Sequence, residues 1–293
     1  MTKTAFYIVA GHAFSLTLPD NPKLWGALGQ YSPFEAQAPV DPLFSLELAE
    51  SLPEGEVETV YDVPTEDGET VVKLYRQGED WLFEMTPDRR LPVCSKMLAA
   101  PDFKSARLLL LTRRLNDALF GINNALMLLY AFNTATLGTL EMHASMVSNS
   151  GKAYLFLARS GTGKSTHSSL WLKHIPGTEL MNDDNPIVRV LEDGSVVAYG
   201  SPWSGKTPCY RNVQAPVGAF VRIRRCEENK ITPLSALEAY ACLYSSSSGY
   251  KADRSFGDGL HATMEKIVTS TPCYVLDCRP DEEAAQVCAS AVR

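Results

Sequence analysis

The sequence predicts an α/β protein in which a β-rich N-terminal region, residues 1–104, precedes a nucleotide-binding region, residues 105–293. The first hundred residues contain short apolar runs separated by prolines and turn residues, which is typical of strands. A leucine-rich stretch with spacings of three and four residues then indicates a helix. Further on, a glycine-rich loop joins an apolar run to another helical pattern. The 293 residues suffice for two modest domains, each with its own core.

In the N-terminal region the expected elements are strands joined by turns. Residues 6–18 predict one or two strands, and residues 21–42, which contain several prolines, predict a loop. Residues 77–80, Gln-Gly-Glu-Asp, have the composition of a hairpin turn. A helix is expected over residues 105–134. The remaining strands of this region are expected at residues 57–63, 71–76 and 81–85.

The C-terminal region begins with a second hairpin. Its strands are expected at residues 140–147 and 152–157, and it leads directly into the glycine-rich loop. A serine tract at residues 245–249 predicts a mobile loop. Strands are expected at residues 179–182, 186–191, 195–199 and 273–278, and helices at residues 233–244, 260–269 and 281–292.

The charge balance and the cysteines restrict the partners and the compartment. The net charge of −7 gives no basic footprint for nucleic acid or an anionic membrane, so neither partner is expected. Charged and amide side chains within residues 108–132 exclude a membrane span there. Arg222, Arg224 and Arg225 could form a small anion site, but a solvated strand edge is the simpler interpretation. Seven cysteines without a Cys-x-x-Cys pair or zinc spacing indicate a reduced, cytoplasmic protein.

Residues 158–166 carry the most specific signal and read Ala-Arg-Ser-Gly-Thr-Gly-Lys-Ser-Thr. An apolar run precedes them and a helical pattern follows, which is the layout of a phosphate-binding P-loop. In such a loop backbone N–H groups point at phosphate oxygens, the lysine reaches the β- and γ-phosphates, and the hydroxyl ligates Mg²⁺. Ala158 replaces the usual first glycine, and the alternative is an ordinary glycine–serine loop. The sequence therefore predicts an ATP-binding loop made of Ser160, Gly161, Thr162, Gly163, Lys164, Ser165 and Thr166.

Two carboxylates, Asp183 and Asp184, end an apolar run that a single expected helix separates from the P-loop. A P-loop that binds a metal-bound nucleotide usually needs such a carboxylate to hold Mg²⁺, or Mn²⁺, or its waters. Because successive strand residues face opposite ways, the two aspartates should differ in role. The alternative is a simple turn, since Asn-Asp-Asp-Asn-Pro is rich in turn-forming residues. We expect Ser165, Asp183 and Asp184 to hold the metal.

His143 lies in Glu-Met-His-Ala-Ser, residues 141–145, on the strand before the P-loop. Alone, a strand histidine is more often structural than catalytic. In combination, His-Ala-Ser, Ser-Gly-Thr-Gly-Lys-Ser-Thr and Asn-Asp-Asp resemble the superfamily of HPr kinase/phosphorylase and phosphoenolpyruvate carboxykinase, over about residues 138–225. The resemblance implies a phosphoenolpyruvate carboxykinase-like P-loop core with a mixed β-sheet. It also implies catalytic roles for His143 near the transferred phosphate, for the phosphate lysine, and for the aspartate pair as metal ligands and base: Lys164, Asp183 and Asp184.

The chain departs from the kinase branch of that superfamily at two places. Thr166 stands where HPr kinases have glutamate, and the arginine- and glycine-rich kinase signature is not evident. In its place, residues 200–207 read Gly-Ser-Pro-Trp-Ser-Gly-Lys-Thr and resemble the smaller HPr-kinase-like proteins found with peptide-modification systems. Lys206 is a candidate to reach a phosphate of ATP, and the alternative, a solvated loop lysine, has equal weight. Trp203 is expected to serve packing rather than base stacking.

We therefore expect an ATP-dependent kinase of the HPr-kinase-like type that transfers the γ-phosphoryl group to a hydroxyl, the serine of a small protein or peptide. The N-terminal region is the expected recognition module for this acceptor, by analogy alone. Related kinases are oligomeric, so a homo-oligomer is a further expectation. Two alternatives stay open: a nucleotide-binding regulatory or scaffold protein without transfer activity, and, less favoured, a small-molecule enzyme of the carboxykinase type.

Overall fold

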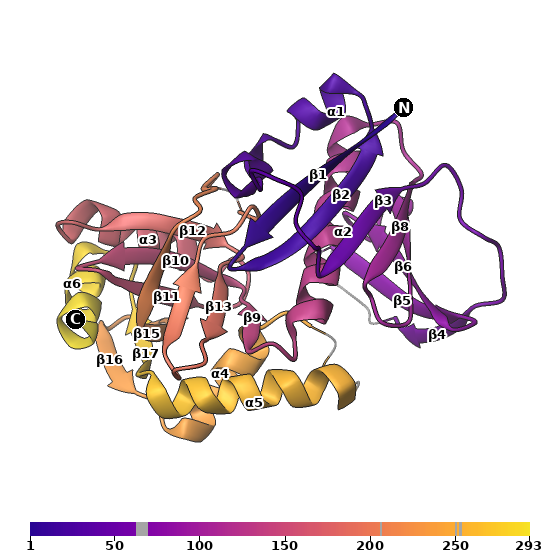
Figure 1. Ribbon diagram of the computed structural model, residues 1–293. Coiled ribbons are helices and arrows are strands. Elements are labelled where there is room, and N and C mark those ends of the chain that lie inside the picture. The colour runs from indigo at the N-terminus through magenta and orange to yellow at the C-terminus, as the bar shows by residue number, and fades with distance from the viewer. Residues whose placement is uncertain (63–69, 206, 250, 252–253) are drawn as a thin grey trace. The chain divides into compact units, whose positions relative to one another are not determined.

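The computed structural model describes residues 1–62, 70–205, 207–249, 251 and 254–293 (Figure 1). The chain divides into two compact units, Met1–Asn133 and Thr134–Arg293. Both units contain helices and a mixed sheet, so the expected α/β class is confirmed. Among the described residues, no helix combines the length and the apolar character that a membrane crossing requires.

The described part of the first unit forms an eight-stranded sheet in the order β1-β2-β3-β8-β7-β6-β5-β4. Strand β3 pairs in parallel with β2 and β8, and the other neighbours are antiparallel. The expected turn at residues 77–80 is confirmed, because it joins the paired strands β5 and β6. The strands are β1 (Thr2–Val9), β2 (His12–Pro19), β3 (Phe44–Leu48), β4 (Glu58–Tyr61), β5 (Val71–Gln77), β6 (Asp80–Thr86), β7 (Ser95–Ala99) and β8 (Ser105–Leu110).

Helix α2 (Leu115–Thr134) covers one face of this sheet, and two short helical segments, α1 (Pro22–Gly26) and η1 (Gly29–Phe34), follow β2. The Tyr130 hydroxyl donates a hydrogen bond to the carbonyl of Val9, at the end of β1. Near the end of α2, Asn133 donates to the carbonyl of Phe103. These two bonds fix the helix to the backbone beneath it.

The helix expected over residues 105–134 starts later than the leucine spacing indicated. Ser105–Leu110 is strand β8, and it pairs with β3 and β7. In a short apolar run, the spacing of the apolar residues does not distinguish a buried strand from a helix. The spacing of the leucines of β8 and α2 together therefore predicts a single helix. The division between the units accordingly lies after Asn133, beyond the boundary expected after residue 104.

The described part of the second unit forms a nine-stranded sheet in the order β12-β10-β11-β15-β14-β13-β9, with β17 paired to β15 and β16 paired to β17. The P-loop strand β11 is antiparallel to β10 and parallel to β15, and β15 is parallel to β17. The expected hairpin before the P-loop is confirmed in the pair β10 and β11. The strands are β9 (Thr139–Glu141), β10 (Ala144–Asn149), β11 (Lys152–Leu157), β12 (Glu179–Asp184), β13 (Ile187–Val190), β14 (Val196–Tyr199), β15 (Gln214–Arg225), β16 (Lys230–Pro233) and β17 (Cys273–Cys278).

Helices cover both faces of the sheet around β11 (Figure 1). Alternate side chains of β11 explain this, since strand residues point to opposite faces in turn. Leu155 and Leu157 enter the apolar cluster that contains α4 (Ala236–Ser246) and α5 (Arg254–Ser270). Tyr154 and Phe156 enter the cluster that contains α3 (Lys164–His174) and α6 (Glu282–Val292). The strand before the P-loop is therefore buried on both faces, which gives the loop a rigid base.

The serine tract at residues 245–249 is bonded to the strand end that precedes the P-loop. Ser246 ends α4, and its carbonyl accepts a hydrogen bond of 2.6 Å from the backbone N–H of His143. The backbone N–H of Ser248 donates to the carbonyl of Glu141 at 2.8 Å. The expectation of a mobile loop overlooked these partners, because the bonds join segments about a hundred residues apart in sequence.

Candidate active site

The P-loop connects the end of β11 to the first turn of α3. Gly161 has a φ of 73° and Gly163, the N-cap of α3, has a φ of 128°. Side chains with a Cβ rarely adopt such angles, so glycine is required at both positions. Gly163 offers no side chain to cap the helix, which leaves the first N–H groups of α3 available to an anionic ligand.

Arg225, at the end of β15, donates hydrogen bonds to two backbone carbonyls of the P-loop. Its guanidinium donates to the carbonyl of Gly161 at 2.5 Å and to the carbonyl of Thr162 at 3.0 Å. Arg224 instead forms a two-bond ion pair with Asp277 on the neighbouring strand. Both arginines are exposed at the strand end, as the sequence predicted, and Arg225 in addition bonds the P-loop.

Asp183 lies beside the P-loop hydroxyl. Strand β12 pairs with β10 so that Asp183 faces Ser145, which places the aspartate next to the start of α3. The Ser165 hydroxyl donates to Asp183 Oδ1 at 2.9 Å. Asp183 is only 2% exposed, and its Oδ2 has no hydrogen-bond partner among the residues that the structure describes. An unpaired buried carboxylate oxygen is unfavourable, and a cation would compensate it.

The donor set at this position fits Mg²⁺. That ion binds proteins through one or two carboxylates and takes its other ligands from phosphate oxygens and water. Ser165 and Asp183 supply a hydroxyl and a carboxylate oxygen at hydrogen-bond distance from each other. Over the described part of the chain, no group of three or more His, Cys, Asp or Glu side chains is arranged to hold a metal. The residues present therefore suit a nucleotide-bound Mg²⁺ rather than a metal cage made by protein alone.

Lys164, His143 and Asp184 form a chain of polar contacts next to Ser165 and Asp183. Lys164 Nζ lies 2.8 Å from His143 Nε2, and the same ring nitrogen lies 3.2 Å from Asp184 Oδ1. Nε2 accepts from the ammonium when it carries no proton and donates to Asp184 when it carries one, so it makes one of these two bonds at a time. Burial lowers the pKa of Lys164, although the carboxylates of Asp183 and Asp184 oppose that shift. These contacts bring the lysine and both aspartates of the sequence prediction together.

Asp184 combines an unusual backbone conformation with an ionised side chain. Its φ of 132° is rare for a residue with a Cβ, and such strain is found at functional sites. Burial alone would raise the pKa of Asp184. The hydrogen bond with His143 and the charges of His143 and Lys164 outweigh burial and hold this pKa below its ordinary value. The side chain of Asp184 is 37% exposed, so it is accessible from solvent, whereas Asp183 is not.

Residues 201–205, which follow β14, are hydrogen-bonded to the strand that carries Asp183 and Asp184. Asn182 donates to the carbonyl of Trp203 at 3.0 Å, and the Ser204 hydroxyl donates to the carbonyl of Asp183 at 2.9 Å. A Cβ at Gly205 would lie only 3.0 Å from the Cβ of Asp184, so a small residue is needed there. Trp203 is buried, as expected for a packing role. Lys206, the candidate phosphate ligand, lies outside the described residues.

Glu141 is a buried acid that the sequence reasoning did not single out. It is 2% exposed and lies on β9, two residues before His143. Its Oε1 accepts a hydrogen bond of 3.4 Å from the Ser248 hydroxyl, and burial raises the pKa of Glu141 to about 8. A charged residue between the core residues Leu140 and Met142 was the available signal. At neutral pH this carboxyl is largely protonated, unlike that of Asp184.

Comparison with known proteins gives matches among solved structures. No protein-family model matches the chain, and no curated protein sequence matches it. Among solved structures, it is similar to the HPr(Ser) kinase/phosphatase from Coxiella burnetii, with 11% sequence identity and a TM-score of 0.31. The match covers 52% of this chain and 93% of that kinase/phosphatase chain. The roles of the site residues are therefore argued from geometry.

Proposed function

We propose that the protein is an ATP-dependent phosphotransferase that moves the γ-phosphoryl group to a hydroxyl, the serine of a small protein or peptide. The observation that carries the proposal is the bond between Ser165 and Asp183, with the second oxygen of Asp183 buried and unpaired in the described structure. The Ser165–Asp183 pair lies next to the polar contacts that connect Lys164, His143 and Asp184. Three features that phosphoryl transfer uses occur close together at the ends of the strands. They are a loop that can bind phosphate, a position suited to a metal, and an ionised carboxylate.

The binding step uses the P-loop. The N–H groups at the start of α3 and the ammonium of Lys164 receive the phosphate oxygens, and Arg225 keeps the loop carbonyls turned away from them. Mg²⁺ bound through Ser165 and Asp183 would neutralise charge on the phosphates. Lys164 must then exchange its contact with His143 for a phosphate oxygen. Its lowered pKa reflects burial, and the negative phosphates would favour its charged form.

The transfer step uses Asp184. The acceptor hydroxyl oxygen forms a bond to the γ-phosphorus, the bond between that phosphorus and the β–γ bridging oxygen breaks, and ADP leaves with the electron pair. Asp184 takes the hydroxyl proton, because it is ionised, partly exposed and adjacent to His143. Asp183 is too buried for this role and stays with Ser165. The first unit, Met1–Asn133, is the proposed recognition module for the acceptor.

The test is transfer of labelled γ-phosphate from ATP, with Mg²⁺, to an array of serine-containing peptides. We expect the full chain to label a subset of peptides and Lys164→Ala to lose this activity by about 10²-fold or more. Lys173→Ala, which removes an exposed lysine from the same helix, is the matched control and should keep full activity. ATP binding without any transfer would instead favour a regulatory nucleotide-binding protein. Oxaloacetate-dependent consumption of ATP would favour a carboxykinase-type enzyme.

A further inference from the structure

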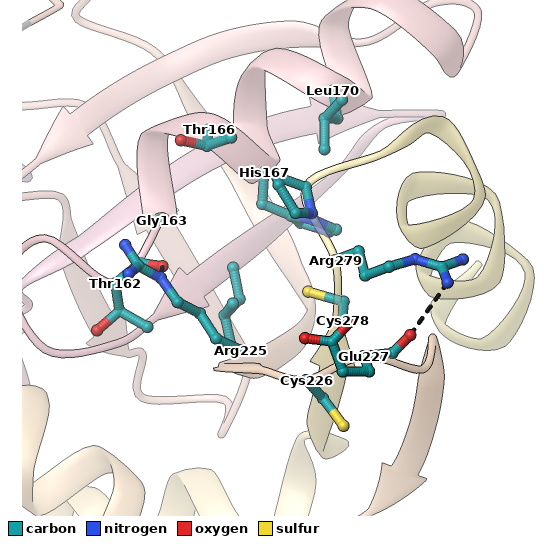
Figure 2. Close-up of a pocket in the computed structure, with 12 residues that line it drawn as sticks. Thr162, Gly163, Thr166, His167, Leu170, Arg225, Cys226, Glu227, Cys278 and Arg279 are labelled. Carbon is teal, nitrogen blue, oxygen red and sulfur yellow. Dashed lines mark hydrogen bonds between the residues drawn. The ribbon is translucent and has the colours of Figure 1, made fainter.

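A cavity of about 980 Å³ adjoins the P-loop at the C-terminal ends of β15 and β17. Figure 2 shows its walls, with Thr166, His167 and Leu170 on the α3 side. Strands β11, β15 and β17 are parallel, so their C-terminal ends meet at one edge of the sheet. Ligands of α/β proteins bind in the crevice outside such an edge. The opposite wall is made of residues that follow the other two strands: Arg225, Cys226, Glu227, Cys278, Arg279 and Pro280.

The cavity continues from the phosphate cradle. Thr162 and Gly163 of the P-loop are part of its lining, so a group attached to bound phosphates would enter it directly. Leu170, Ile223 and Pro280 contribute apolar surface, and polar or charged side chains make up half of the lining residues. A cleft that combines apolar walls with polar groups can hold a small molecule. Two further cavities, of about 480 and 290 Å³, have no P-loop residue in their lining.

His167 is a buried side chain in the cavity wall, and its Nδ1 is closed to solvent. It is 2% exposed, and its Nε2 accepts a hydrogen bond of 3.1 Å from the indole N–H of Trp171. That bond assigns the proton of the neutral ring to Nδ1. Burial lowers the pKa of His167 to about 4, so the ring is neutral at pH 7. The Nδ1–H donor has no acceptor within the described part of the chain, although the ring is part of the cavity lining. Buried donors without a partner are unfavourable and rare.

We propose that this cavity receives the purine base and ribose of the bound nucleotide. The inference rests on the proposed function, because phosphates held at Lys164 place the nucleoside next to Thr162 and Gly163. A purine has two flat apolar faces for the Leu170 and Ile223 walls and ring nitrogens that accept hydrogen bonds. Arg225 connects the two subsites, since it lines the cavity and also bonds the P-loop carbonyls.

The test compares ATP with inorganic tripolyphosphate, which carries the same phosphates and no nucleoside. Both are titrated with Mg²⁺ into the full chain by calorimetry. We expect ATP to bind at least about tenfold more tightly than tripolyphosphate. Leu170→Trp, which fills the cavity, should remove this difference and leave the tripolyphosphate affinity unchanged. Leu172→Trp, on the same helix at a position that is 41% exposed, is the matched control and should change neither affinity.

A further variant keeps the test decisive if Leu170→Trp fails to fold. Cys226→Trp narrows the cavity from an exposed position and should weaken the binding of ATP while it spares tripolyphosphate. Equal affinity for the two ligands, with no effect of Leu170→Trp or Cys226→Trp, would overturn the nucleoside site and leave the phosphate site standing. Binding of neither ligand would overturn the proposed function and the nucleoside site together.

Discussion

The two units of the chain differ in what they bury. The core of the first unit is aromatic: Phe14 stacks on Phe44 with ring centroids 5.1 Å apart, and Tyr7 packs against Phe14 at 5.5 Å. The second unit also buries aromatic rings, and in addition it buries four ionisable side chains close to its P-loop, whereas the first unit buries His12 and Asp88. The four are Glu141, Lys164, His167 and Asp183. Burial of an ionisable group is unfavourable unless a partner compensates it. The second unit therefore retains groups that weaken its core, and groups of this kind concentrate at functional sites.

The largest effect expected from this contrast is on transfer activity, from Asp184→Asn. The amide keeps the size of the side chain but accepts no proton, so the rate of peptide phosphorylation should fall by about 10²- to 10⁴-fold. The free energy of unfolding should fall modestly, because the lowered pKa of Asp184 means that folding favours its ionised carboxyl over a neutral group. Labelled-phosphate transfer and urea unfolding measure the two quantities. An Asp184→Asn protein with near-normal transfer would assign the proton to another group.

A change in the aromatic core of the first unit should have the opposite signature. Phe14→Ala removes a ring that is 0% exposed and should lower the free energy of unfolding by about 3–5 kcal/mol. The affinity of the folded protein for ATP should not change, because the P-loop lies in the other unit. Ile8→Ala, at a position of the same sheet that is 37% exposed, should change the stability little. Loss of ATP affinity in folded Phe14→Ala protein would contradict the division of roles.

Glu141 should make the stability depend on pH. Its folded-state pKa of about 8 lies above the ordinary value of 4.5, so the folded chain holds a proton that the unfolded chain releases. The contribution of Glu141 is therefore complete below about pH 4.5, and it is lost as the pH rises through about 8. The slope should approach about 1 kcal/mol per pH unit in that window.

Urea unfolding between pH 5 and 8 measures this slope. Glu141→Gln should flatten it, since an amide does not titrate. The exposed Glu179→Gln, which removes the carboxylate that pairs with Arg211, should keep the slope of the unchanged protein. An identical slope in Glu141→Gln would show that this carboxyl is ionised in the folded state.

The smallest effect is expected at Arg225. Arg225→Ala removes the two bonds to the P-loop carbonyls and should raise the KM for ATP by about tenfold, with little change in kcat. Arg224→Ala breaks the surface pair with Asp277 and should change KM less than twofold, since exposed ion pairs contribute little. Similar KM values in the two variants would mean that the bonds from Arg225 to the P-loop carbonyls are not needed for ATP binding.

The elements that could be predicted from the sequence are those that a local residue pattern determines. The P-loop, the hairpin before it and the strand that ends at Asp183 and Asp184 are visible in runs of fewer than ten residues, and the structure brings their side chains together. Lys206 stays a prediction, because it lies outside the described residues.

Features that depend on contacts between distant segments could not be predicted from the sequence. Ser105–Leu110 is a strand because β3 and β7 flank it, and its leucines alone do not indicate that. The serine tract is held by Glu141 and His143, about a hundred residues away in sequence. Arg225 bonds P-loop carbonyls about sixty residues away in sequence, so composition and spacing gave no sign of these contacts.

Ser165 and Asp183 are proposed to hold the metal of a bound nucleotide. The most direct measurement is calorimetric titration of ATP into the full chain with and without Mg²⁺, for the unchanged protein and for Asp183→Asn. The account predicts that Mg²⁺ strengthens ATP binding by about tenfold or more in the unchanged protein and has little effect in Asp183→Asn. An equal gain from Mg²⁺ in both proteins, or no binding of ATP to either, would contradict it.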